Sequence, residues 1–228
     1  MIELLSHINI RVNQKVFLKD PSSTELGKSI IIESIKLIEE CGFEEFTFKK
    51  LATKINTTES SVYRYFANKH RLLIYLLSWY WSWLEYKLVF NTANVSDASL
   101  KLKIAIESLI DEDENFMING YICLNSLLKI AISESVKSFL TREIDNQNEE
   151  GFFSSYINLC ARLSKIINEV NPDYSYSNSL VAVIFEGIHQ QKFFSLHIKS
   201  HSDFEVWEKN KMKDFFINLA IKTIKSNG

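Results

Sequence analysis

The sequence predicts an all-α fold, and two features of its 228 residues support this prediction. It contains six glycines and two prolines, which are few for the many tight turns that a large sheet needs. From Pro21 onward the apolar residues recur at helical spacing, as Ile31, Ile35 and Ile38 do. Long helices joined by short loops are therefore expected to account for most of the chain.

Residues 1–20 are expected to form a short extended arm. Ile8, Ile10 and Val12 alternate with polar residues, and a period of two is typical of extended segments. Two alternatives remain open: the arm lies ordered on the rest of the protein, or it is basic and partly disordered.

The first helix is expected at about residues 25–41. Ser22 and Glu25 have the spacing of a capping box, which favours a helix start. Gly42 can adopt a left-handed conformation, which favours a helix end at that point.

Two short helices are expected to follow, with a sharp turn between them. Thr47 can cap a helix over residues 48–54, and Thr58 can cap another that runs through Tyr65. Asn56 stands in the turn, and asparagine tolerates positive φ better than other non-glycine residues. With the first helix, these elements have the pattern of a helix-turn-helix inside a three-helix unit.

The remaining helices follow from the same periodicity. A helix rich in aromatic residues is expected from about residue 69 to residue 91, and an acidic loop is expected at residues 111–115. The other expected helices span about residues 97–110, 120–133, 135–169, 175–200 and 204–226, and Gly151 can break the third of these.

The composition favours a cytoplasmic protein without a cofactor. No apolar run approaches the roughly 20 residues of a membrane span, and the first residues do not resemble a signal peptide. Cys41, Cys123 and Cys160 form no CxxC pair, which favours reduced thiols over a disulfide framework or a zinc site.

Residues 42–73 resemble the N-terminal domain of the TetR (tetracycline-repressor) family of bacterial transcription regulators. The residues that stand at the spacings of that family are Gly42, Thr47, Leu51, Ala52, Thr58, Tyr63, Phe66, Lys69, Leu72 and Leu73. The resemblance covers about residues 25–90, and beyond them it is limited to a helical stretch of the right length. After the arm at residues 1–20, it implies a helix-turn-helix DNA-binding domain at residues 21–72 and a larger helical domain at residues 73–228 for effector binding and dimerisation.

The resemblance also implies a function and a set of partners. The chain is expected to regulate transcription, as a repressor by the habit of the family, and not to be an enzyme. Its implied partners are double-stranded DNA with a palindromic operator, a second copy of the chain, and a small apolar or aromatic effector, but no membrane. If the arm is disordered and basic, it would enter a minor groove.

The formal net charge of −2 is compatible with DNA binding because the charges are segregated. Residues 25–45 hold six acids and two lysines, whereas residues 46–71 hold six basic residues and one acid, Glu59. The expected reading side is therefore basic.

The third helix is expected to read the bases. Ser60 and Arg64 should face outward, with Ser61 and Tyr63 beside them. The small serines let the helix approach the base edges, and Arg64 can bind guanine through two hydrogen bonds. Two interpretations remain open for Glu59: a carboxylate favoured by the helix dipole, or an acceptor for the cytosine amino group.

Thr47, Tyr65 and Lys69 match family positions that contact phosphate. Lys69 and the N–H groups at the start of the next helix would form a phosphate clamp. The alternatives are a helix cap for Thr47 and an exposed aromatic ring for Tyr65.

The aromatic helix carries the candidate effector site. Trp79, Trp83, Tyr86 and Phe90 share one face of it, which fits either core packing or a cavity for an apolar or aromatic ligand. The last two helices are candidates for a dimer face, through residues that can equally belong to the core: Phe185, Ile188, Phe215, Phe216, Leu219 and Ile224.

Neither a metal site nor a catalytic site is expected. Glu186 and His189 can share a helix face, as can His197 and His201, but no cysteine joins them. The sequence has no nucleophile elbow, zinc-protease motif, P-loop or dinucleotide fingerprint. The competing hypothesis is a helical ligand-binding or scaffold protein of the same fold that no longer binds DNA, and salt-dependent binding to duplex DNA distinguishes the two.

Overall fold

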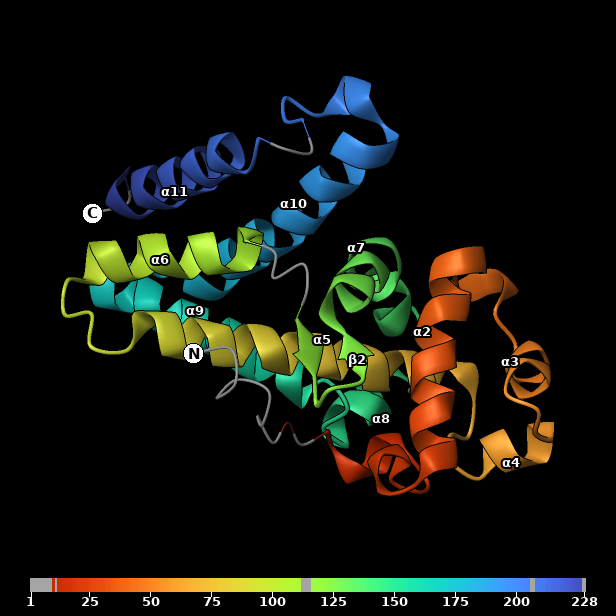
Figure 1. The fold of residues 1–228 in the computed structure, drawn as a ribbon. Helices are drawn as coiled ribbons and strands as arrows, with labels where there is room; N and C mark the ends of the chain where they lie inside the picture. Colours follow the sequence, from red (N-terminus) through yellow and green to blue (C-terminus); the bar gives the residue numbers. More distant parts are fainter. Residues whose placement is uncertain (1–9, 11, 112–115, 206–207, 227–228) are drawn as a thin grey trace. The chain divides into compact units, whose positions relative to one another are not determined.

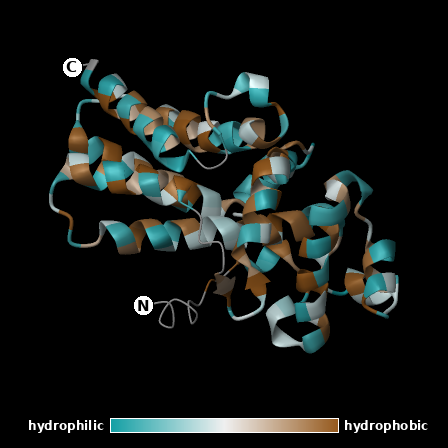
Figure 2. Cartoon of the chain, turned by 45° about the horizontal axis from the view of Figure 1, so that its top comes forward, coloured by the Kyte–Doolittle hydropathy of each residue, from teal (hydrophilic) through white to brown (hydrophobic). Residues whose placement is uncertain are grey.

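A computed structural model describes residues 10, 12–111, 116–205 and 208–226, and most of these residues are helical (Figure 1). The prediction of an all-α fold is confirmed. Apolar and polar residues alternate around the helices, as expected when each helix packs one face against its neighbours (Figure 2).

The described chain divides into two compact units. The first holds η1 (Gln14–Val16), η2 (Pro21–Ser23), α2 (Glu25–Glu45), α3 (Phe48–Lys54), α4 (Glu59–Tyr63), β1 (Met117–Ile118), β2 (Ile122–Cys123), α7 (Leu124–Phe139) and α8 (Ile144–Glu149). The second holds α6 (Ala98–Ile110), most of α9 (Ser154–Val170), α10 (Ser177–His197), η3 (Lys199–His201) and α11 (Lys209–Ser226). The long helix α5 (Lys69–Thr92) supplies residues up to Trp81 to the first unit and the rest to the second.

The start of α2 differs from the expected capping box. Pro21–Ser23 forms a 3-10 turn whose N-cap is Asp20, so Ser22 lies before the helix. The cap of α2 is Thr24 instead, whose hydroxyl accepts a 3.0 Å hydrogen bond from the N–H of Gly27. The backbone of Pro21 approaches Gly27 so closely that a Cβ there would lie 2.2 Å from the Pro21 carbonyl oxygen.

The end of α2 follows the sequence prediction. Gly42 has φ 74° and ψ 163°, so the helical conformation is interrupted at that residue. The backbone N–H of the next residue, Phe43, donates to the Glu134 carboxylate of α7 (3.3 Å), and α2 and α7 pack side by side.

The expected helix-turn-helix is present in α3 and α4. Thr47 caps α3 by accepting from the N–H of Lys50, and Thr58 caps α4 by accepting from the N–H of Ser61. Asn56, in the turn between them, has φ 51°. The third helix ends at Tyr63, two residues before its expected end.

The described part of the arm is ordered. It contains a 3-10 turn where the sequence predicted an extended segment. Asn13 caps the 3-10 turn η1, and the Asn13 amide donates to the carbonyl oxygens of Glu150 and Gly151 (2.9 and 2.8 Å). Ile8 lies outside the described residues. The side chain of Val16 is fully buried, so this segment completes the core of the first unit.

A short antiparallel hairpin precedes α7, where the sequence predicted only helix and loop. Its strands pair Met117 with Cys123 and Ile118 with Ile122. Asn119 and Gly120 have φ 51° and 75°, the two positive values that a tight hairpin turn of this kind needs.

The helices of the second unit form its own core. α11 packs on α6 and α10, and apolar residues of α10 and α11 lie inside, among them Phe185, Ile188 and Phe216. The buried ammonium of Lys192 donates to the carbonyl oxygen of Ile110 (2.8 Å), at the C-terminal end of α6 where the helix dipole favours a cation.

The described residues contain neither a helix suited to span a membrane nor a cluster of metal-binding side chains. None of their helices is both long and apolar enough to cross a bilayer. Nor do they contain a group of three or more histidine, cysteine, aspartate or glutamate side chains placed to hold a metal ion.

Candidate nucleic-acid interface

Helix α4 is held rigidly although it has only five residues. Val62 and Phe66 are fully buried beneath it. At its N-terminus the Thr58 hydroxyl contacts the hydroxyls of Ser60 and Ser61, both at 2.9 Å. A helix this short is unstable alone, so its orientation comes from these caps and from the packing.

The outer side of α4 presents most of the predicted base-reading residues. Glu59, Ser60 and Arg64 are exposed, and Ser61 is half-buried. The Arg64 guanidinium donates to the Ser61 hydroxyl (3.1 Å), which holds it along the helix surface. Tyr63 is 46% exposed, and its ring meets that of Phe48 edge to face at 5.0 Å between centroids.

Tyr65 is placed inside the unit, in contrast to Tyr63 and Arg64. Its side chain is 3% exposed, and its hydroxyl lies 2.7 Å from the hydroxyl of Thr24, the residue that caps α2. Tyr65 therefore links the end of α4 to the start of α2. Its expected phosphate contact remains a prediction, and the burial of the ring does not support it.

Lys69 caps the end of α2. Its ammonium donates to the carbonyl oxygens of Phe43 (2.9 Å), Glu44 (2.9 Å) and Phe46 (3.2 Å), and it lies 4.8 Å from the ring centroid of Phe43. An ammonium has three donors, so these bonds occupy all of them in this arrangement. The expected phosphate clamp stays a prediction. The start of α5, which Asn68 caps, can still contribute to such a clamp.

The other exposed cations near α3 were not singled out from the sequence, because lysines on a helix surface carry no distinctive spacing. Lys49 is exposed, and Lys50 and Lys54 form ion pairs with Glu45 (3.5 Å) and Glu40 (3.4 Å). Exposed pairs of this kind exchange readily for a phosphate partner, since each contributes at most about 1 kcal/mol.

The acids of α2 are matched by lysines of α7. Lys129 pairs with Glu39, and Lys137 pairs with Glu44 (3.1 Å) and Glu134 (2.8 Å). Burial alone would raise the pKa of Glu39, but hydrogen bonds from Lys129 and Ser126 and the charge of Lys129 lower it overall. This pairing offsets the negative field of α2 on the side away from α3.

The four aromatic residues predicted to bind a ligand fall into two groups. Trp79 is 3% exposed and lies in the first unit. In the second unit, Trp83, Tyr86 and Phe90 stack along α5 with centroid distances of 6.1 and 6.3 Å.

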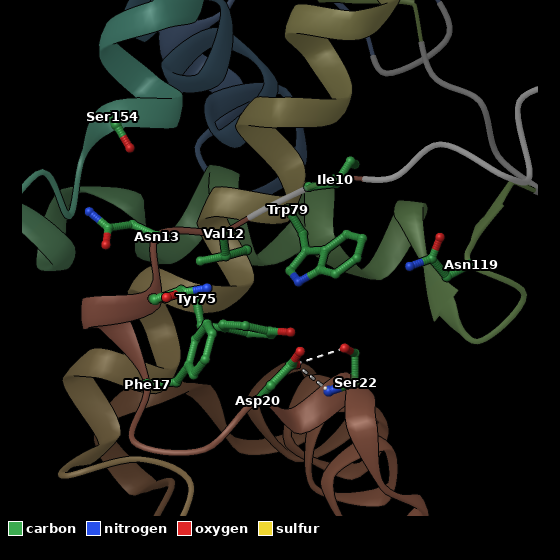
Figure 3. Close-up of a pocket in the computed structure, with 11 residues that line it drawn as sticks. Ile10, Val12, Asn13, Phe17, Asp20, Ser22, Tyr75, Trp79, Asn119 and Ser154 are labelled. Carbon is green, nitrogen blue, oxygen red and sulfur yellow. Dashed lines mark hydrogen bonds between the residues drawn. The ribbon is translucent and has the colours of Figure 1, made fainter.

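The first unit contains a cavity of about 560 Å³, and Trp79 is one of its walls (Figure 3). The residues that join Trp79 there were not predicted from the sequence. They come from the arm, α5, the hairpin turn and the start of α9, and include Phe17, Asp20, Tyr75 and Asn119. No periodicity could have identified them, since they are far apart in the sequence.

The histidine pairs of the last helices lie in different surroundings. His189 is buried against Phe185 (4.6 Å between ring centroids), and burial, with the positive charge of Lys192, lowers the pKa of His189 to about 3. Glu186 accepts a hydrogen bond from the Tyr156 hydroxyl (3.1 Å), and burial raises the pKa of Glu186. His197 and His201 are both exposed.

Comparison with known proteins agrees with this geometry. Residues 30–76 match the family described as bacterial regulatory proteins, tetR family. No protein with a curated description matches the chain.

Two solved structures share the fold. The structure of AibR in complex with isovaleryl coenzyme A and operator DNA is 13% identical with a TM-score of 0.56, and the match covers 84% of this chain and 96% of that one. The fatty acid degradation regulator FadR from Bacillus halodurans is 17% identical with a TM-score of 0.60, and the match covers 83% of this chain and 96% of that one. Residues 30–76 are thus similar to the N-terminal domain of the tetR family of bacterial regulatory proteins, and the chain as a whole shares the fold of these two structures.

Proposed function

We propose that this chain represses transcription by binding a palindromic operator in the cytoplasm and that a small molecule releases it. The observation that carries the proposal is the surface of α4, where Ser60, Ser61 and Arg64 face outward on a helix fixed by caps and packing. In this proposal residues 21–72 bind DNA, and residues 73–228 provide dimerisation and effector binding.

Arg64 is assigned the main specific contact. Its guanidinium is exposed, and a guanine offers it two acceptors in the major groove, which discriminates against the wrong base by about 1–3 kcal/mol. Thr47 and Lys49, at the start of α3, are assigned contacts to the phosphate backbone, together with the N-terminal end of α5. Glu59 repels phosphate from its position in the first turn, so it either reads a cytosine or serves only the helix dipole.

Dimerisation is assigned to the exposed sides of α10 and α11. Four of the six apolar residues expected at a dimer face are fully or nearly fully buried within the chain: Phe185, Ile188, Phe216 and Ile224. Val183 and Phe215 are 59% and 49% exposed, so they are better placed for a second copy.

The effector part of the proposal has support from a structural neighbour. The AibR complex contains both isovaleryl coenzyme A and operator DNA. We infer that this chain also combines a DNA site with an effector site, and that effector binding favours a dimer whose reading helices no longer match the operator.

Selection of bound duplexes from a random DNA pool at ~0.1 M salt tests DNA reading. An enriched inverted repeat with half-sites about one helical turn apart, or a multiple of it, is the expected result. Arg64→Ala should relax the preference at one base position of each half-site. Weak binding without enrichment, lost on adding salt, would instead favour the ligand-binding or scaffold protein.

Sedimentation analysis of Val183→Glu tests the dimer face. Its matched control is Val136→Glu, which adds the same charge at a site on α7 that is 55% exposed. We expect the Val183 variant alone to sediment as a monomer. Equal behaviour of the two variants would remove Val183 from the interface.

A further inference from the structure

The arm lines part of the cavity of the first unit, which is partly open to solvent. Val12, Asn13, Phe17 and Asp20 line one side of it, and the long helix α5 lines another through Tyr75 and other residues. Figure 3 shows the rings of Tyr75 and Trp79 extending into the space from α5, with Phe17 and Asp20 beside them. A volume of about 560 Å³ is within the range of small-molecule sites.

Three aromatic rings form a continuous wall. The rings of Phe17 and Tyr75 meet edge to face at 5.9 Å, and those of Tyr75 and Trp79 meet at 6.3 Å with an interplanar angle of 62°. The face of an aromatic ring carries negative charge, so any ring face that is exposed to the cavity would favour a cation within it.

Asp20 is the single charged residue among the described residues that line the cavity. The backbone N–H and the hydroxyl of Ser22 both donate to its Oδ1 atom (2.8 and 2.7 Å), which fixes the direction of the carboxylate. Burial raises the pKa of the Tyr75 hydroxyl, and the charge of Asp20 acts in the same direction, as it does on the pKa of Tyr121. The carboxylate is therefore within electrostatic reach of the ring wall.

We propose that this cavity binds an organic cation, an ammonium ion attached to an apolar or aromatic body, with Asp20 as its counter-ion and Phe17, Tyr75 and Trp79 around its charged group. The amide of Asn119 would bind a polar end of the same ligand. A ligand rich in phosphate is disfavoured, because its charge would face the Asp20 carboxylate.

The wall of this cavity is bonded to the reading helix. The N–H of Leu18, next to Phe17, donates to the carbonyl oxygen of Tyr65 at the end of α4 (2.8 Å). Three residues before Leu18, the Lys15 carbonyl accepts from the guanidinium of Arg71 in the first turn of α5 (3.0 Å). A ligand that moves Phe17 would strain these two bonds, so the cavity is placed to act as the effector site of the proposed repressor. This second part rests on the proposed function.

Calorimetric titration of the full chain tests the ligand class. The probes are 4-(trimethylammonio)phenol and 4-tert-butylphenol, which have the same shape and differ in charge. We expect the cation to bind more tightly, and Asp20→Asn to weaken its binding by about fivefold while leaving the neutral probe unaffected. Asp145→Asn, at an exposed acid of α8 in the same unit, is the matched control and should change nothing.

Equal affinity for both probes, or no response to Asp20→Asn, would overturn the assignment of a cation, and no binding of either probe would overturn the site. The link to the reading helix is tested separately, by measuring the affinity for the selected operator with and without saturating cation. An unchanged affinity would reject the effector role alone. If the chain selects no operator, the proposed function is contradicted, but the titration still tests the cavity as a cation site.

Discussion

Replacing Lys69 by methionine separates the two roles that its position allows. Methionine keeps an unbranched apolar stem against the ring of Phe43 but removes the ammonium that bonds three carbonyl oxygens at the end of α2. If the ammonium acts as a cap, the variant loses stability. If it acts on phosphate, the variant loses DNA affinity and part of its salt dependence.

The magnitude follows from the geometry of the cap. A cation near a helix C-terminus contributes about 0.3–1 kcal/mol when exposed and up to ~2 kcal/mol when partly buried. Lys69 is half-buried and forms three bonds, so a loss of about 1–2 kcal/mol is expected. For a chain of this size that corresponds to a fall in Tm of roughly 2–8 °C.

Thermal unfolding measures the stability of the variant, and operator titrations over a range of salt concentrations measure its DNA affinity and the salt dependence of that affinity. Lys49→Met is the matched control for stability alone, since it removes the same charge from an exposed lysine of α3 and should leave Tm within about 1 °C, although its assigned phosphate contact should also lower DNA affinity. An unchanged Tm for Lys69→Met, with a salt slope reduced by about 0.9, would refute the cap and establish a phosphate contact.

Three further variants test other contacts. Gly27→Ala places a Cβ 2.2 Å from the carbonyl oxygen of Pro21, so the 3-10 turn must move away from α2, and urea unfolding should show a loss of at least about 1–3 kcal/mol. Gly151→Ala combines a φ of 77° with a Cβ 2.9 Å from the Asn13 amide, so the arm should become accessible to protease and lose protection in hydrogen exchange. The folded pKa of His189, about 3, lies below its unfolded value of 6.5, so the stability it contributes is complete above pH ~6.5 and is lost as pH falls toward ~3. Urea midpoints measured between pH 7 and pH 5 should therefore fall less in His189→Gln than in the unchanged chain, and identical slopes would contradict the assignment.

Much of the reading unit was predictable because its signals are local. Thr47, Asn56 and Thr58 act through neighbouring backbone atoms, so their spacing alone predicted the caps and the turn. The positions of Tyr65 and Lys69 were not predictable in this way. Their partners are Thr24, 41 residues away, and carbonyl groups 23 to 26 residues away, and such contacts depend on how the helices pack.

The cavity was also difficult to predict, because its residues are far apart in the sequence. Trp79 was selected from its helical spacing, but nothing in that spacing indicated whether its neighbours would be core residues or a ligand. Asp20 was even harder to predict as a cavity residue, because its carboxylate caps the turn at Ser22 in a segment expected to be extended.

The hydrogen bonds of Asn13 limit how early the first unit can finish folding while the chain is being synthesised. The Asn13 amide binds the carbonyl oxygens of residues 137 and 138 positions later, yet Asn13 leaves the ribosome long before them. At 5–20 residues per second, the arm waits roughly 7–28 s for its docking site. The first unit can therefore be completed only when about two-thirds of the chain has been made.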